Sequence, residues 1–115
     1  MAFKLDLIIE QGATFKQGFE YVNAAGFPIS IVGWDARMQI RQTKQDPLFI
    51  LELTVSNGRI SLGGLAGTID LTIPSSVTAA LNFTQAVYDL ELIDPIGDVI
   101  RLIEGKVILS YEVTK

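Results

Sequence analysis

Residues 33–41 read GWDARMQIR, and the alternation within this stretch decides the fold class. Every second residue is apolar, which is typical of a β-strand with one buried face. The apolar positions are Trp34, Ala36, Met38 and Ile40, and the polar positions are Asp35, Arg37, Gln39 and Arg41. The stretch therefore predicts an amphipathic strand that buries one row of side chains and exposes the other.

The same period of two recurs on both sides of this strand. It indicates further strands over 3–9, 14–21, 48–55, 59–62, 68–73, 86–92 and 99–114. The last range is either one long strand with a bulge or two strands that bend at Gly105. Asn57-Gly58, between two of the ranges, is the strongest short signal of a hairpin. Short strands joined by turns predict an antiparallel sandwich or a small barrel.

One segment has the features of a short helix instead. Pro74 is tolerated in the first turn of a helix, and Ser75 or Ser76 can cap its N-terminus. We expect this helix near 75–81, where Leu81 is its last apolar residue. Because strands and helices do not alternate along the chain, an α/β fold is not expected.

Composition bounds the domain organisation and the partners. A chain of 115 residues forms one domain, which we expect to span 1–115. With 49% hydrophobic and 19% charged residues it should fold. No apolar run is long enough for a membrane helix, and the first residues do not resemble a secretory signal. Nine basic against 13 acidic residues give a net charge of -4, which disfavours nucleic acid as a partner.

The chain contains no His and no Cys. Disulfides, thiol chemistry, Cys/His zinc sites and His-based triads are therefore excluded. Carboxylates remain, and Asp89 and Glu91 fall on one face of a predicted strand. A carboxylate pair about 5–9 Å apart in a cleft can hydrolyse glycosides. Strand alternation alone also explains both residues as part of a solvated face, so the sequence assigns no catalytic residue.

Two segments contain residue types that occur in ligand-binding loops. Asp94, Asp98 and Glu104 carry the oxygen ligands that calcium prefers, but Asp94–Asp98 lacks the dense acidic spacing of a calcium loop and reads as a turn. Gly63–Gly67 is rich in glycine, but it lacks the Lys-Ser/Thr that follows the glycines of a phosphate loop. We therefore expect no metal site and no cofactor.

Cations and aromatic residues lie near one another in the middle of the chain. Arg37, Arg41 and Lys44, with Trp34 and Phe27, could form a nucleic-acid surface. Such recognition needs cations and aromatic rings on one exposed face. Here the cations fall in the polar phase and the aromatic residues in the apolar phase, so we expect Trp34 to lie in the core.

Several large apolar residues fall out of phase with the inward-facing sets. They are Ile8, Leu48, Ile50, Val87, Ile93, Ile100 and Ile108. If they face solvent, they form an apolar patch of the kind that marks a partner surface. Bulges that change the phase, or a sheet that curls over them, would hide them instead. The first and last strands are also long and regular, so as sheet edges they would invite strand addition.

The ordered set of segments resembles small virion proteins of tailed bacteriophages. It is also similar to the N-terminal immunoglobulin-like module of some siphophage baseplate upper proteins. The segments that carry the resemblance are Gln11–Phe15, Gly26–Ile29, Gly33–Arg41, Tyr88–Leu92, Gly97–Val107 and Ser110–Thr114. The resemblance implies an all-β, antiparallel, immunoglobulin-like β-sandwich of about 7–9 strands with one short helix near 75–81.

The resemblance also implies a function without catalysis. The chain would be a virion structural or accessory subunit, assembled in the host cytoplasm, that docks on tail, baseplate or neck proteins. It would act in multiple copies or as a homo-oligomer, with other virion proteins as partners and neither nucleic acid nor membrane. Because the chain stops at Lys115, where a baseplate upper protein continues, a free-standing accessory domain is expected.

Three alternatives stay open at this point. The first is a capsid decoration protein. The second is a carbohydrate-binding module for host surface sugars, which requires Trp34 or several tyrosines in an exposed line. The third is a small hydrolase that uses Asp89, Glu91 or Glu104, which requires two carboxylates that converge in a cleft.

Overall fold

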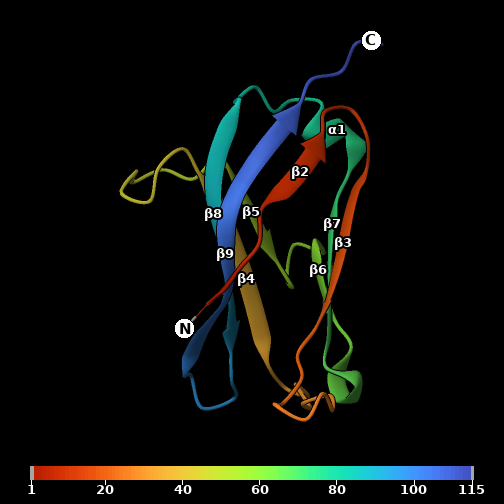
Figure 1. The fold of residues 1–115 in the computed structure, drawn as a ribbon, viewed down its shortest axis with the longest axis vertical. Coiled ribbons are helices and arrows are strands. Elements are labelled where there is room, and N and C mark those ends of the chain that lie inside the picture. Colours follow the sequence, from red (N-terminus) through yellow and green to blue (C-terminus); the bar gives the residue numbers. More distant parts are fainter. Residues whose placement is uncertain (1, 115) are drawn as a thin grey trace.

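Two β-sheets pack face to face in the computed structural model, which describes residues 2–114 (Figure 1). The strands are β1 (Phe3–Lys4), β2 (Leu7–Glu10), β3 (Phe15–Glu20), β4 (Asp35–Arg41), β5 (Leu51–Thr54), β6 (Ile60–Leu62), β7 (Thr68–Ile73), β8 (Gln85–Ile93) and β9 (Val99–Ser110). A 3-10 turn, η1 (Gly64–Ala66), and a short helix, α1 (Ser75–Thr78), complete the chain. The predicted all-β sandwich with one short helix is confirmed.

The larger sheet has the strand order β1-β9-β8-β4-β5, with β2 also paired to β9, and the smaller has the order β3-β7-β6. Most pairs are antiparallel, as expected, but β1 and β2 run parallel to β9. Strand β9 therefore lies inside the sheet. The prediction that the last strand is an edge is wrong, because the N-terminal strands cover its free side.

Strand β4 has the alternation that the sequence predicts. Ala36, Met38 and Ile40 are buried, each with 1% or less of its surface exposed. The range 48–55 is only partly a strand, since pairing begins at Leu51. Residues 42–50 instead form a loop that projects from the side of the sandwich (yellow, left in Figure 1). This loop is held locally, because the Asp46 carboxylate accepts a hydrogen bond from the Leu48 N–H.

Strand β9 runs without a bend through Gly105, and it ends at Ser110 rather than at the predicted Thr114. Its bulge lies at Leu102. The register with β8 shifts between Leu90 and Glu91, which leaves Leu102 without an opposite residue. Gly105 has a different role. A Cβ at this position would collide with the Leu5 carbonyl, so the missing side chain lets the N-terminal segment pass close to β9 between β1 and β2.

The core lies between the sheets and is built from the inward rows of strands on both sides. Its largest fully buried side chains are Ile9, Ile31, Met38, Ile40, Leu53, Ile69, Leu71, Ile73, Leu90, Leu92, Val107 and Thr78. Trp34 lies at the margin of this core rather than inside it. It is partly buried, and its ring centroid lies 6.1 Å from that of Tyr21 at a tilt of 58°. No helix within residues 2–114 combines the length and apolar character required to cross a membrane.

Candidate functional site

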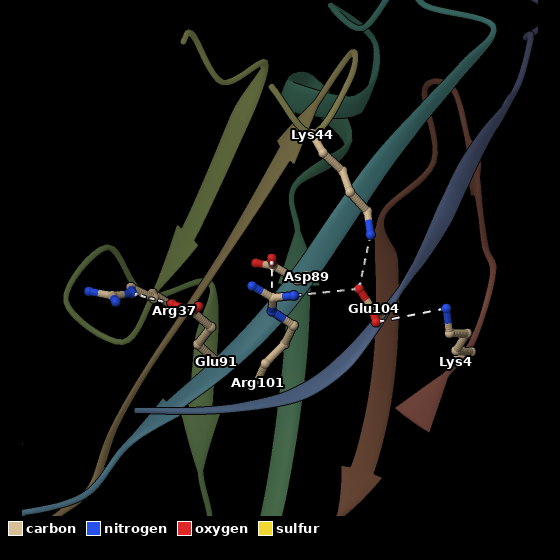
Figure 2. A network of polar contacts seen from close by, with 7 residues as sticks. All are labelled: Lys4, Arg37, Lys44, Asp89, Glu91, Arg101 and Glu104. Carbon is tan, nitrogen blue, oxygen red and sulfur yellow. Dashed lines mark hydrogen bonds and ion pairs between the residues drawn. The ribbon is translucent and has the colours of Figure 1, made fainter. Parts of the chain in front are cut away.

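A groove crosses the outer face of the larger sheet and has a cavity volume of about 450 Å³. We call it the charged groove, because seven charged residues line it, namely Arg37, Arg41, Lys44, Glu52, Asp89, Glu91 and Arg101. The outward rows of β4, β5, β8 and β9 supply most of these side chains, and Lys44 comes from the loop after β4 (Figure 2). Period-two alternation thus places on one surface residues that are far apart in the chain.

Ion pairs link the strands across this face. Arg37 lies directly opposite Glu91 in the β4–β8 register, and its Nε is 2.7 Å from the Glu91 Oε1. On the next strand, the Arg101 Nε lies 3.6 Å from the Asp89 Oδ2. Cross-strand pairs of opposite charge stabilise a sheet by about 0.2–1 kcal/mol each. These ion pairs between strands therefore stabilise the larger sheet.

Glu104 is the centre of the network at the edge of the groove. Its carboxylate lies 3.3 Å from the Lys44 Nζ, 3.8 Å from the Arg101 Nη1 and 3.9 Å from the Lys4 Nζ (Figure 2). Lys44 reaches it from the projecting loop, and Lys4 reaches it from β1. One carboxylate thus contacts cations from the projecting loop, from the N-terminal strand and from its own strand.

The two neighbouring carboxyl groups, Asp89 and Glu104, have pKa values that are shifted in opposite directions. Burial raises the pKa of Asp89, and the nearby Glu91 charge raises it further. The hydrogen bond from Lys44 lowers the pKa of Glu104. A pair of carboxyl groups with divergent pKa values is also a feature of general acid–base sites.

The structure brings together all three residues proposed for a hydrolase, namely Asp89, Glu91 and Glu104. Each of them is already paired with a cation of the same face: Asp89 with Arg101, Glu91 with Arg37, and Glu104 with Lys44 and its neighbours. A general acid must hold a proton within reach of a substrate. The ion pairs of these three carboxylates therefore fit a role in stabilising the sheet better than a role in acid–base catalysis.

The cations weighed for a nucleic-acid surface lie in the same groove. Arg37 and Lys44 are paired with Glu91 and Glu104, and the Arg41 Nη1 donates to the Asp46 carbonyl at 2.7 Å. Trp34 and Phe27 lie elsewhere. The predicted separation of cations from aromatic rings is therefore present, although Phe27 is exposed rather than inward-facing.

The Asp94 side chain stabilises the acidic turn after β8. The Asp94 Oδ1 accepts hydrogen bonds from the N–H groups of Ile96 and Asp98, at 3.0 and 2.9 Å. Glu104 lies apart from this turn, in the ion-pair network. Within residues 2–114, no three acidic, His or Cys side chains group in a way that could hold a metal ion.

The glycine-rich loop 63–67 contains η1, and three of its N–H groups donate within the protein. Gly63 donates to Thr68, Ala66 to Gly63, and Gly67 to Gly64. Gly67 has a positive φ of 68° and lies close to the carbonyls of Tyr21 and Ile29. The loop therefore fixes the chain packing at this end of the sandwich.

The same end of the sandwich carries a second candidate surface, which we call the apolar end. It consists of Phe27, Val32, Leu65 and Ile96, which are 66%, 58%, 78% and 84% exposed. They lie on the β3–β4 loop, η1 and the β8–β9 turn, which gather at the lower end of Figure 1. The Ile31 N–H donates to the Gly64 carbonyl at 3.0 Å, so two of these loops are joined.

The residues predicted to be out of phase divide into two groups. Ile8, Leu48, Ile50 and Ile108 are exposed, as the sequence predicts, and Ile8 lies directly opposite Ile108 in the β2–β9 register. Val87, Ile93 and Ile100 are instead partly buried. Val87 lies in the lining of the charged groove.

Sequence reasoning missed several members of these surfaces. Arg101, Glu52 and Lys4 complete the charged groove and its network, and Val32, Leu65 and Ile96 complete the apolar end. The outward phase of each strand was a usable signal for Arg101 and Glu52. Nothing in the local pattern brings three separate loops to one end.

No family model and no curated protein matches this chain. The sandwich fold, the charged groove and the apolar end are therefore the features from which a function can be inferred.

Proposed function

We propose that the protein is a non-enzymatic structural subunit of a tailed-bacteriophage virion, which docks on neighbouring tail, baseplate or neck proteins. The observation that carries the proposal is the apolar end. Four large apolar side chains are exposed on three loops that lie at one end of the sandwich, where a water-soluble domain normally places polar residues. Burying them against a partner is favourable at about 25 cal/mol per Å² of apolar surface.

The charge distribution around the apolar end supports docking there. Residues 22–33 and 63–67 contain no charged side chain, and the two carboxylates of the third loop belong to Asp94 and Asp98. Contact at this end therefore removes little charge from water, which is the costly part of an interface. A partner surface with apolar pockets and a basic rim would fit it.

The rigidity of the loops also favours a docking role. The Asn23 Oδ1 accepts hydrogen bonds from the N–H groups of Ala25 and Phe27, and the Tyr21 N–H donates to the Gly67 carbonyl. A surface that is already ordered loses little conformational entropy when it binds. Many copies in a symmetric particle would add avidity to a modest single contact.

The test is direct binding to purified virion proteins. The tail, baseplate, neck and capsid proteins encoded by the flanking genes are each immobilised and exposed to the wild-type protein. Binding to a tail, baseplate or neck protein is the expected result. Binding to the capsid protein alone would favour the decoration role, and binding to host glycans or glycoside cleavage in place of protein binding would overturn the proposal.

Matched variants then locate the surface. Leu65→Ser in the apolar end should weaken binding at least tenfold. Leu48→Ser is the control, because Leu48 is 75% exposed against 78% for Leu65 but lies on the projecting loop. Equal loss in both variants, or no loss in Leu65→Ser, would contradict docking through the apolar end.

A further inference from the structure

Strand β3 is an edge of the smaller sheet and has one open side. It pairs only with β7 among the described strands, and it forms the right-hand margin of the sandwich in Figure 1. The Tyr21 N–H donates to the Gly67 carbonyl at 2.8 Å, which continues the β3–β7 ladder. Because the direction of backbone groups alternates along a strand, the N–H and C=O groups of Lys16, Gly18 and Glu20 point to the open side.

The edge on the opposite side of the sandwich is protected in a way that β3 is not. On β5, the Glu52 carbonyl accepts from the Asn57 Nδ2 and the Arg59 Nη1, and the Thr54 N–H donates to the Asn57 Oδ1. These side chains occupy the backbone groups that a new strand would need.

The other two edges are short or partly occupied. Strand β6 has three residues. On β2, the Glu10 carbonyl already accepts from the Ala13 N–H. On the open side of β3 the structure records one hydrogen bond, from the Gln17 Nε2 to the Gly18 carbonyl, and both groups are exposed. Strand β3 is therefore the longest open edge of the described chain.

The sequence of β3 is complementary to itself when it is reversed. In an antiparallel pair with a two-fold axis at Gly18, Gly18 faces its own copy and Lys16 faces Glu20 on both sides. The main-chain N–H and C=O groups of all three residues point to the open side. Each facing pair of residues therefore exchanges two main-chain hydrogen bonds. The register thus satisfies the backbone and the charges together, in about six main-chain bonds and two ion pairs.

We propose that two copies of this chain associate through β3, antiparallel and centred on Gly18, so that their smaller sheets form one continuous six-stranded sheet. Gly18 suits the axis because it brings no side chain to the point where the two strands approach. Lys16 and Glu20 are exposed in the single copy and gain partners only in the pair. When the second copy binds, the hydrogen bond from the Gln17 Nε2 to the Gly18 carbonyl breaks, and the carbonyl accepts from the second copy instead.

This inference rests on the proposed function only in taking the protein to act in several copies. It uses a surface separate from the apolar end, on β3 rather than on the loops. The occupant is a second copy and not an arbitrary strand, because the arrangement of Lys16, Gly18 and Glu20 matches its own reversal.

Charge reversal gives a sharp test by sedimentation equilibrium. Wild-type protein should dimerise, and Lys16→Glu should weaken the dimer about tenfold or more, since it creates two facing Glu–Glu pairs. Glu20→Lys should do the same through two Lys–Lys pairs. The double variant K16E/E20K should restore wild-type association, because the pairs are opposite again and the net charge is unchanged.

Lys106→Glu is the control for Lys16→Glu, since it makes the same change in net charge at another exposed site. It should leave the dimer unchanged. A wild-type protein that stays monomeric at millimolar concentration, or a double variant as weak as the single ones, would overturn the proposal.

A backbone variant tests the edge independently of charge. Gly18→Pro removes an N–H that points to the open side while the hydrogen bonds to β7 remain, so the monomer should keep its circular dichroism spectrum and lose the dimer. A dimer that persists in this variant would place the interface elsewhere. Lys16→Glu should still bind the virion partner, and Leu65→Ser should still dimerise, so failure of one proposal is distinguishable from failure of the other.

Discussion

The Tyr88 hydroxyl donates a hydrogen bond of 2.6 Å to the Leu5 carbonyl, across 83 positions of the chain. Tyr88 lies opposite Gly105 in the β8–β9 register, and the missing side chain of Gly105 is what lets Leu5 come close. The phenol is buried, with 4% of the residue exposed. The Tyr88 side chain thus helps to fix the point where the N-terminal segment crosses from β1 to β2, together with the hydrogen bonds from the Leu5 N–H to the Glu104 carbonyl and from the Lys106 N–H to the Asp6 Oδ1.

Replacing Tyr88 with Phe should destabilise the fold by about 1–2 kcal/mol, because the buried Leu5 carbonyl loses a donor. Urea unfolding followed by tryptophan fluorescence would measure the change. Tyr111→Phe is a suitable comparison, since its hydroxyl donates to the Asn82 and Phe83 carbonyls from a half-exposed residue. Equal stability of Tyr88→Phe and wild type would contradict the role assigned to this bond.

The ionisation of Tyr88 should make the fold sensitive to alkali. Burial, with a contribution from Asp6, raises the pKa of Tyr88 to about 12, against 10.0 for an ordinary tyrosine. A raised pKa means that the fold favours the neutral phenol. The stability that the neutral Tyr88 phenol contributes to the fold is therefore fully present below pH 10. It is lost as the pH rises through about 12.

Ultraviolet titration of tyrosinate would check this prediction. The late-titrating phenol should be missing from the curve of Tyr88→Phe, and Tyr111→Phe should retain it. A wild-type curve in which every tyrosine ionises together near pH 10 while the protein is folded would count against a buried phenol.

Thr78 is the one fully buried polar residue in the described core, and its hydroxyl joins α1 to the β2–β3 turn. It donates to the Ala13 carbonyl at 2.9 Å and accepts from the Gly12 N–H at 3.1 Å. Thr78→Val keeps the shape but leaves both backbone groups unpaired, which should cost about 1–3 kcal/mol. Thr78→Ser keeps the hydroxyl and should cost about 1 kcal/mol or less, for one lost methyl group.

Thermal unfolding of the two variants would separate hydrogen bonding from packing. The melting temperature should fall further in Thr78→Val than in Thr78→Ser. The reverse order would mean that the methyl group, and not the hydroxyl, holds α1 against the turn.

The carboxyl groups of the charged network should titrate in opposite directions from their ordinary values. In carbon-13 NMR, the pKa of Asp89 should lie above the usual aspartate value and that of Glu104 below the usual glutamate value. Lys44→Met should raise the pKa of Glu104 by removing its hydrogen-bond donor.

The signs of the linked stabilities differ as well. Because the pKa of Glu104 is lowered, its contribution is present above the ordinary glutamate pKa and is lost as the pH falls through the folded value. The raised pKa of Asp89 acts in the opposite sense, so its contribution is lost as the pH rises through the folded value. A Glu104 pKa that Lys44→Met leaves unchanged would contradict the contact between loop and sheet.

Local alternation predicted the strands well wherever one face is buried. Strand β4 and strand β8 follow the expected phase, because only one register buries Met38 and Leu90 and directs Arg37 and Asp89 to the outer face of the sheet. The same reasoning placed Asp89 and Glu91 on a solvated face. Burial of one row is a strong physical constraint, and it can be read from sequence alone.

Contacts between distant segments could not be predicted in this way. Phe3 pairs with Ile103, and nothing in the period of either strand identifies the other as its neighbour. For the same reason, the sequence did not indicate that Lys4 and Lys44 would meet at Glu104. Residues 48–50 have a strand-like pattern, but they follow Pro47 and lie outside the paired region, so their propensity is overridden.

Strands β2 and β9 lie side by side and run in the same direction, which sets how the molecule responds to tension. In Figure 1 the two ends of the chain leave the sandwich on opposite sides. If the ends are pulled apart, β2 and β9 are drawn past each other along their length. Bonds such as Leu5 N to Glu104 O and Gln11 N to Ser110 O then carry the load simultaneously rather than opening one by one. The seam between the first and last strands should therefore resist unfolding more strongly when it is pulled along its length than when its bonds are opened one at a time.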